Sequence, residues 1–385
     1  IEEEQLVKTG ITSQYPQYSP DGKEVAFFED RAALRIVNLK SKEIRTVLDG
    51  KYVYSYSDGD IAFEWSPDSK WLLSTYIGNG GWNNQDIALV KADGKEVHNL
   101  TNSGYSDSNG KWVLDGKAML FQSDRAGYRS HGSWGAEDDA YIMFFDLDAY
   151  NRFNMSKEEI ELADANKDEK EKKEDEKKEE AKKKADEKQK KTGKIEVEKV
   201  KPLELDIENC RDRIVRLTAN SSHMGDAVLS KDGDKLYYQA AFEDDYDLWQ
   251  HDLKDGSTKL VMKGVGQGNL QTDKDVKNLF ICNGSSIKKV DLSGFSTKDI
   301  SFEANFNYKP AEERQYLFDH IWRQVKDKFY DPKIHGVDWE GYRKTYEKFL
   351  PYINNNFDFQ EMLSEMLGEL NASHTGARYY ASNSA

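Results

Sequence analysis

Ser373 and His374 are the residues of this sequence whose types and spacing point most directly to catalysis. They follow an apolar stretch that ends at Leu370, so we expect them where a helix passes into an accessible loop. An imidazole that titrates near pH 7 can take a proton from a serine hydroxyl and return it to a leaving amine. The spacing alone is weak evidence, because a catalytic triad is defined by geometry and an adjacent Ser-His pair is more often a local cap or a surface polar group.

Two other groups of residues imitate functional motifs more weakly. Asp164, Asn166 and Asp168 imitate the start of a calcium-binding loop, but Glu169 stands where the sharp turn of such a loop requires glycine. We therefore predict no metal site there.

The glycine-rich loop 129–135 is the second of these groups. His131 and Trp134 in this loop could line a substrate passage, although a loop packed by its own aromatic residue is the favoured interpretation.

The two cysteines, Cys210 and Cys282, have no zinc-binding spacing and are expected to be free thiols, with a single disulfide as the alternative. We expect no cofactor and no metal.

The composition excludes several classes of function. The formal net charge of −15 argues against nucleic acid as a partner, because phosphate binding needs clustered Lys and Arg. No apolar run approaches the roughly 18 residues of a membrane span, and Ile1 leads into acidic residues rather than a signal segment. The chain is therefore expected to be soluble.

An internal repeat predicts the fold of the first three hundred residues. Ser19-Pro20-Asp21-Gly22 and Ser66-Pro67-Asp68 each precede a short apolar run, and related copies begin near 113, 230 and 272. The first two copies lie 47 residues apart and the last two lie 42 apart, close to the period of a four-stranded propeller blade. We predict a mainly β protein, a β-propeller of about five four-stranded blades over 1–307 followed by a small all-α segment over 308–385. A β-sandwich with regular turns is the alternative.

An insertion of about 70 residues interrupts the third repeat, and we place it at about 152–200. Residues 167–191 hold 12 Lys and 10 Asp or Glu, so they are predicted to be disordered or a single solvated helix.

The hydrophobic period changes from 2 to 3.6 at Pro310, which predicts helices. Asp338 and Asp358 are expected to cap helices over 339–350 and 359–370. Because the apolar stripes need a partner surface, Trp322 and Trp339 are expected to be partly exposed, or covered by the propeller or a second copy of the chain. The first stripe consists of Leu317, Ile321, Val325 and Phe329, before a stop at Asp331-Pro332.

Landmarks of this segment occur in the order found in one enzyme family. The segment resembles the opening of the tricorn protease core, within the C-terminal-processing serine peptidase family, over about 310–376. The landmarks are His320-Ile321-Trp322, Lys328-Phe329-Tyr330-Asp331-Pro332, Gly336-Val337-Asp338-Trp339, Tyr342-Arg343-Lys344-Thr345-Tyr346, Glu365-Met366-Leu367-Gly368-Glu369-Leu370 and Ser373-His374.

The resemblance implies a role for each residue of the pair. It makes His374 the general base and Ser373 its neighbour in the family's Ser-His-Ser-Glu arrangement, with the nucleophile and the Glu supplied from far downstream. It implies peptide-bond hydrolysis through an acyl-enzyme, with the propeller as a gate or filter for peptides. Since the sequence ends at Ala385, these residues alone are expected to be inactive.

The resemblance also implies partners and a compartment. The expected partners are peptide substrates, the remaining catalytic and PDZ-like domains of the parent chain, and further copies in a homo-oligomer. The cytoplasm is the expected compartment, with the periplasm as the alternative. A non-catalytic TolB-like propeller that binds proteins is the second hypothesis, and a prolyl-oligopeptidase-type hydrolase the third. The helical segment disfavours the second, and the lack of a Gly-x-Ser-x-Gly motif disfavours the third.

Overall fold

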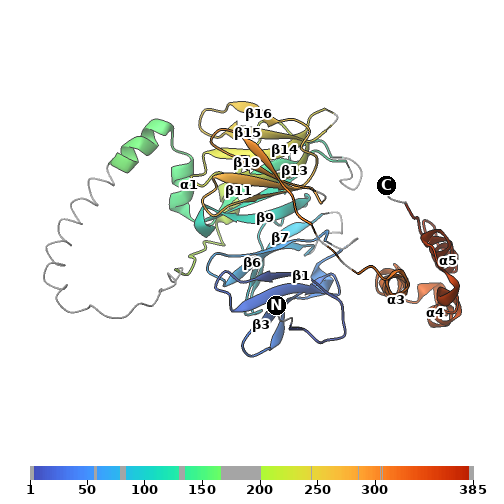
Figure 1. Ribbon diagram of the computed structural model, residues 1–385. Coiled ribbons are helices and arrows are strands. Elements are labelled where there is room, and N and C mark those ends of the chain that lie inside the picture. The colour runs from blue at the N-terminus through green and yellow to red at the C-terminus, as the bar shows by residue number, and fades with distance from the viewer. Residues whose placement is uncertain are drawn as a thin grey trace, which may run out of the picture. The chain divides into compact units, whose positions relative to one another are not determined.

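The computed structural model describes residues 4–55, 59–78, 84–129, 135–165, 201–243, 245–284, 286–303, 305 and 307–380. The chain forms two compact units, Ile1–Ser301 and Phe302–Ala385, the first built of strands and the second of helices (Figure 1).

The first unit is a five-bladed β-propeller of four-stranded antiparallel sheets, which confirms the predicted fold class and excludes the sandwich. Blade 1 comprises β1 (Ser13–Tyr18), β2 (Glu24–Glu29), β3 (Ala33–Asn38) and β4 (Ile44–Leu48). Blade 2 comprises β5 (Phe63–Trp65), β6 (Trp71–Tyr76), β7 (Asp86–Lys91) and β8 (Val97–Asn99). Blade 3 comprises β9 (Asp107–Val113), β10 (Ala118–Ser123), β11 (Asp139–Phe144) and β12 (Ile214–Arg216). Blade 4 comprises β13 (His223–Leu229), β14 (Lys235–Ala241), β15 (Asp247–Asp252) and β16 (Thr258–Met262). Blade 5 comprises β17 (Asn269–Thr272), β18 (Asn278–Cys282), β19 (Ile287–Asp291) and β20 (Thr297–Ile300).

The repeated serine has a structural role at the turn between the first two strands of a blade. Its hydroxyl accepts a hydrogen bond from the backbone N–H five residues later, so it closes the loop that starts the second strand. Blade 5 uses the carboxylate of Asp273, which accepts from Asn278 N at 3.2 Å. The serine bonds are those of Ser19 with Glu24 at 3.0 Å, Ser66 with Trp71 at 2.9 Å and Ser230 with Lys235 at 2.9 Å.

The hydrophobic core lies between neighbouring sheets. Apolar clusters join blades 1 and 2, 2 and 3, 3 and 4, and 4 and 5. At the first of these contacts the rings of Phe28 and Phe63 meet edge to face with centroids 5.1 Å apart. Because both faces of each middle sheet are covered, β10 is buried along its whole length. Such strands read as apolar runs rather than as alternating patterns.

The insertion separates the third and fourth strands of blade 3, and its ends pack on the propeller. Helix α1 (Leu147–Phe153) places Tyr150 and Phe153 against Phe144, with ring centroids 5.6 and 5.1 Å away. After the insertion, a 3₁₀ turn, η4 (Cys210–Arg213), leads into β12. Phe153 therefore still packs on the propeller, although it lies beyond residue 152, where the insertion was predicted to start. The charged run 167–191 lies outside the described residues.

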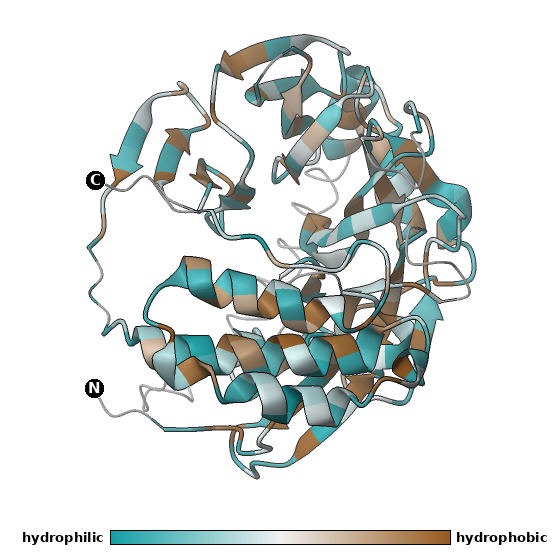
Figure 2. Cartoon of the chain, turned by 90° about the vertical axis from the view of Figure 1, so that its right-hand side faces the viewer, coloured by the Kyte–Doolittle hydropathy of each residue, from teal (hydrophilic) through white to brown (hydrophobic). Residues whose placement is uncertain are grey.

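The second unit consists of α3 (Pro310–Lys328), α4 (Trp339–Glu347) and α5 (Asn356–Gly368), with 3₁₀ turns η5 (Ile334–Gly336) and η6 (Leu350–Tyr352) between them. Figure 2 shows apolar and polar residues along these helices.

Two details of the prediction for the helices were wrong. Leu317 is 37% exposed and Phe318 is the fully buried residue of α3, whereas Ile321, Val325 and Phe329 of the predicted stripe do pack against the core. Asn355, not Asp358, caps α5, by accepting a hydrogen bond from Asp358 N at 2.9 Å.

Two tryptophans close the helical unit on itself. The indole N–H of Trp322 donates to the carbonyl of Trp339 at 3.1 Å, and the indole N–H of Trp339 donates to the carbonyl of Trp322 at 3.0 Å. Trp339 is only 3% exposed, so the expectation that it needs a separate partner surface was wrong. Asp338 caps α4 as predicted, by accepting from Gly341 N at 2.9 Å.

Candidate functional site

Ser373 and His374 lie in an exposed turn just after α5. The Ser373 hydroxyl and Nδ1 of His374 are 2.6 Å apart, so the two predicted site residues do contact each other. His374 has a φ of 62°, in the left-handed region that residues other than glycine seldom adopt. The backbone of this turn therefore holds the imidazole in a specific orientation.

Hydrogen bonds to the helices anchor the segment around the turn. The Ser364 hydroxyl, on α5, accepts from Ala377 N at 3.0 Å and donates to Ala377 O at 3.1 Å. Before the turn, the carbonyl of Leu370 is 3.0 Å from Nδ1 of His335, which lies in η5. The position of His374 is thus fixed from both sides by contacts within the helical unit.

The pair has the chemical capacity of an oriented base. With the proton on Nδ1, the imidazole donates to the Ser373 hydroxyl and keeps a lone pair on Nε2, the nitrogen that can accept a proton. In the described part of the chain, no carboxylate is hydrogen-bonded to either residue of the pair. A nucleophile facing Nε2 would have to come from elsewhere.

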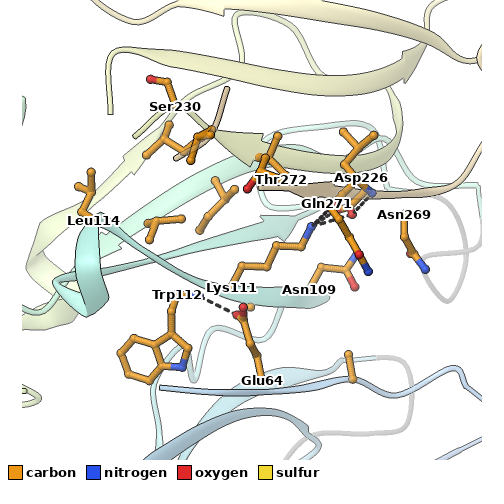
Figure 3. Close-up of a pocket in the computed structure, with 18 of the residues that line it drawn as sticks. Glu64, Asn109, Lys111, Trp112, Leu114, Asp226, Ser230, Asn269, Gln271 and Thr272 are labelled. Atoms are coloured by element: carbon orange, nitrogen blue, oxygen red, sulfur yellow. Dashed lines mark hydrogen bonds and ion pairs between the residues drawn. The ribbon is translucent and has the colours of Figure 1, made fainter. Parts of the chain in front are cut away.

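The propeller contains a second candidate site, a cavity of about 1160 Å³ (Figure 3). The first strand of every blade contributes a polar residue to its lining. These residues are Gln17, Glu64, Lys111, Asp226 and Gln271. The cavity is therefore the central channel of the propeller.

An ion pair crosses this channel between blades 3 and 4. The Lys111 ammonium lies 2.6 Å from each carboxylate oxygen of Asp226, and Figure 3 shows the two side chains pointing toward each other. Asp226 also accepts from Leu270 N at 2.8 Å, which connects blade 4 to blade 5. The pair binds three successive blades together around the channel.

Glu64 is the other charged group deep in the channel. Its Oε2 accepts a hydrogen bond from Trp112 N at 2.7 Å, between blades 2 and 3. Part of the side chain faces the cavity, yet the surrounding strands remove most of the water from its carboxylate. This burial raises the pKa of Glu64 to about 7, against the opposing effects of the Trp112 hydrogen bond and the Lys111 charge.

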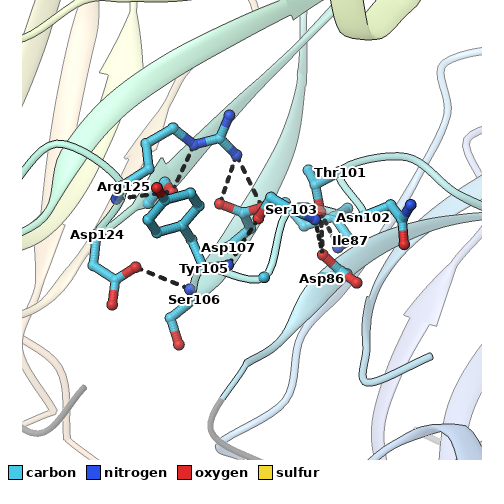
Figure 4. A network of polar contacts seen from close by, with 12 residues as sticks. Asp86, Ile87, Thr101, Asn102, Ser103, Tyr105, Ser106, Asp107, Asp124 and Arg125 are labelled. Atoms are coloured by element: carbon cyan, nitrogen blue, oxygen red, sulfur yellow. Dashed lines mark hydrogen bonds and ion pairs between the residues drawn. The ribbon is translucent and has the colours of Figure 1, made fainter. Parts of the chain in front are cut away.

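A buried polar network fixes β9, the strand that carries Lys111 (Figure 4). Asp107, at the start of β9, has no exposed surface and accepts from one Arg125 nitrogen at 2.8 and 2.9 Å and from the Ser103 hydroxyl at 2.6 Å. The Arg125 guanidinium lies 5.0 Å from the ring centroid of Tyr141. The network also includes Asp124, whose carboxylate accepts from Ser106 N at 3.0 Å. Charge and hydrogen bonds therefore position this channel strand.

The remaining sequence candidates contribute no site in the described residues. Asp164 forms a two-pronged ion pair with Arg152 at 2.8 and 2.9 Å. Both cysteines are free thiols, as expected, and burial raises the pKa of Cys210. None of the helices that the structure describes is long and apolar enough to cross a membrane. His131, Trp134, Asn166, Asp168 and Glu169 lie outside the described residues.

Sequence reasoning missed the polar residues of the channel. Gln17 and Glu64 each stand two residues before the repeated serine of their blade, and Gln271 stands two residues before Asp273. Since side chains alternate along a strand, the same repeat position faces the channel in blades 1, 2 and 5. A comparison of that position across the repeats would have found these three residues, but not Asp226, which stands four residues before Ser230.

Comparisons with known proteins give relatives for both units. The tricorn protease C1 domain family matches residues 310–368. Tricorn protease homolog 1 of Streptomyces coelicolor is 23% identical over 385 residues, which cover 92% of this chain and 33% of that protein. The tricorn protease homolog of Saccharolobus solfataricus is 22% identical over 379 residues, covering 93% of this chain and 31% of that protein.

A solved structure has a similar fold. The crystal structure of the tricorn protease superposes on this chain with a TM-score of 0.61 at 12% identity, covering 94% of this chain and 33% of that one. The chain thus spans about one third of the length of the relatives it matches.

Proposed function

Because this chain is a tricorn protease-like protein, we propose that it forms the propeller and the first helical part of the core of a serine peptidase that hydrolyses peptides. The observation that carries the proposal is the 2.6 Å contact between Ser373 and His374, just beyond the segment that matches the C1 domain. In the proposed reaction a serine attacks the scissile carbonyl, an acyl-enzyme forms, and water then releases the second product.

His374 is the general base in this proposal and Ser373 holds it in place. Nε2 takes the proton of the attacking serine and delivers it to the leaving amine. The Ser373 hydroxyl can accept from Nδ1–H in the tautomer that leaves the Nε2 lone pair free, the tautomer that the carboxylate stabilises in a Ser-His-Asp triad. This division of roles is supported by the exposed position of the turn and by its anchoring to α5 through Ser364.

The nucleophile and the oxyanion donors come from further domains of the parent chain in this proposal. Residues 1–385 by themselves are then inactive, because a base without an activated nucleophile cannot start acyl transfer. The partners are peptide substrates, the remaining catalytic and PDZ-like domains, and further copies of the chain in a homo-oligomer. We retain the cytoplasm as the proposed compartment.

The propeller acts as the gate or filter for peptides. The observation in favour is the channel of about 1160 Å³, which is lined by polar residues from all five blades. A non-catalytic propeller that only binds proteins is the competing function. The helical unit argues against it, because a docking propeller does not need a segment that matches a peptidase core domain.

Peptide hydrolysis by the full-length parent protein, followed with a fluorogenic peptide, tests the proposal. We expect turnover by the parent protein and labelling of one serine by a serine-directed phosphonate. Residues 1–385 alone are expected to show neither. A parent protein that hydrolyses no peptide and reacts with no phosphonate would contradict the proposal, and so would turnover by residues 1–385.

A further inference from the structure

The charged groups of the channel differ in how many of their hydrogen-bonding positions already have a partner. Lys111 and Asp226 neutralise each other, and Asp226 also accepts from the backbone N–H groups of Ala227 and Leu270 at 2.8 Å each. Lys111 directs its remaining contacts to the carbonyls of Ala227 and Leu270, at 3.2 and 3.4 Å. This pair therefore has little capacity left for a ligand.

Glu64 has such capacity. One carboxylate oxygen accepts from Trp112 N, and the other has no hydrogen-bond partner among the described residues. Figure 3 shows Glu64 reaching from β5 toward the strand that carries Lys111. Burial raises the pKa of this carboxyl to about 7, because the Trp112 hydrogen bond and the Lys111 charge compensate its ionised form only in part. A cation beside the second oxygen would supply that compensation.

The surroundings of Glu64 fit an ammonium group better than a metal ion. Calcium and similar cations take six or more oxygen ligands, several of them carboxylates. In the described residues no group of three or more His, Cys, Asp or Glu side chains could hold a metal. The neutral amides of Gln17, Asn109 and Gln271 line the same cavity. With Asp226 already paired to Lys111, the carboxylate of Glu64 together with these amides matches the single charge and three donors of a primary ammonium.

The walls of the channel fit an extended chain attached to that ammonium. The first strand of each blade stands at the edge of its sheet, so one edge has no neighbouring strand within the sheet. Gly110, Gly225 and Gly268, on or beside these strands, line the cavity without side chains. Backbone groups at such an edge that no side chain occupies can pair with an extended peptide.

We propose that the propeller channel binds the primary ammonium group of an extended peptide, with Glu64 as its carboxylate partner. That the ligand is a peptide rests on the proposed function, whereas the ammonium specificity rests on the channel itself. Glu64 then selects peptides by their charge before they reach the catalytic centre.

Binding of three short alanine peptides to residues 1–385 tests the inference, with a fluorophore at the carboxyl end and fluorescence anisotropy at pH 7.5. One peptide has a free amino terminus, one is acetylated, and one is acetylated with a single lysine. We expect at least one amine-bearing peptide to bind about tenfold more tightly than the acetylated alanine peptide, as a charge-assisted hydrogen bond provides. Preference for the first or the third assigns the ammonium to the terminus or to the side chain.

Glu64→Gln is the decisive variant, because the amide oxygen still accepts from Trp112 N while the charge is lost. We expect it to abolish the preference for amine-bearing peptides without lowering the melting temperature. Asp115→Asn is the matched control, since it removes an exposed carboxylate that lines the same cavity. This variant should keep the preference.

Three results would overturn the inference: equal binding of the amine-bearing and acetylated peptides, a preference that survives Glu64→Gln, or no binding of any peptide. The proposed function fails by a different measurement, hydrolysis by the parent protein. If the parent protein hydrolyses peptides and the Glu64→Gln variant keeps the preference for amine-bearing peptides, only the inference is refuted. Amine-selective binding in a parent protein without hydrolytic activity refutes only the peptidase.

Discussion

His374 makes a contact with Ser373 through one nitrogen and leaves the other unpartnered in the described structure. In the parent peptidase, His374→Ala should lower kcat by roughly 10³, because general base catalysis is lost. The melting temperature should stay close to that of the wild type, since the side chain is exposed. Ser373→Ala removes only the partner of Nδ1 and should cost about tenfold to a hundredfold. Steady-state kinetics and thermal unfolding check both variants, and an active His374→Ala enzyme would contradict the assignment.

Asp138 provides a prediction about pH. Burial, assisted by the charges of Asp124 and Asp139, raises the pKa of Asp138 from 3.8 to about 7. The folded state therefore binds this proton more tightly than the unfolded state, so the contribution of Asp138 to stability is greatest below about pH 4 and is lost as the pH rises through 7. Asp138→Asn should raise the melting temperature at pH 8 more than at pH 5. Asp232→Asn, on an exposed turn, is the control and should change it little at either pH.

Among individual residues, the sequence pointed to the Ser373-His374 pair but not to the polar residues of the channel. The pair could be found because both residues are neighbours in a recognisable order of landmarks. Glu64, Lys111 and Asp226 come from three blades, and only the packing of successive blades brings them together. The raised pKa of Glu64 and the pairing of Lys111 with Asp226 depend on that packing, which no local pattern carries.

Among the elements, β9 depends most on buried charge. Asp107→Ala should lower the free energy of unfolding by about 3 to 5 kcal/mol, because it leaves the largely buried Arg125 without its carboxylate. Unfolding by denaturant measures this loss of free energy, provided that the variant and the wild type have the same m value. Asp255→Ala, which removes an exposed partner 3.5 Å from Lys157, should cost far less, because water and salt screen exposed ion pairs. A loss below about 1 kcal/mol for Asp107→Ala would show that the network does not hold β9.

The strands were more predictable than the helix ends. The short apolar runs that follow the first two copies of the repeat form β2 and β6, because a turn followed by a continuous apolar run is typical of a buried strand. The cap of α5 was misplaced because Asn355 and Asp358 are both good capping residues at a spacing of three. Leu317 was misplaced because a period of four does not distinguish it from its neighbour Phe318, although the rest of the predicted stripe packs against the core.

For the whole molecule, the insertion should matter only through its two ends. Replacing residues 166–200 by a flexible Gly/Ser linker should leave the melting temperature nearly unchanged, since such a charged sequence buries little apolar surface. A replacement that also removes α1 should lower it by several degrees, because Tyr150 and Phe153 then leave Phe144 uncovered. Calorimetry measures the melting temperatures of both variants. Equal melting temperatures would show that α1 does not stabilise the propeller.

The separation of β11 from β12 also has a consequence for biosynthesis. Roughly 70 residues lie between these two strands, so a ribosome needs roughly 4 to 14 s after β11 before it delivers the strand that completes blade 3. Throughout that interval β11 is an open edge that a second nascent chain could join. Asp139 stands on that edge, and its partners Arg216, Thr218 and Ser221 arrive only with β12 and the residues that follow it. An uncompensated carboxylate disfavours pairing with the wrong strand, so Asp139 protects the nascent chain before it stabilises the finished protein.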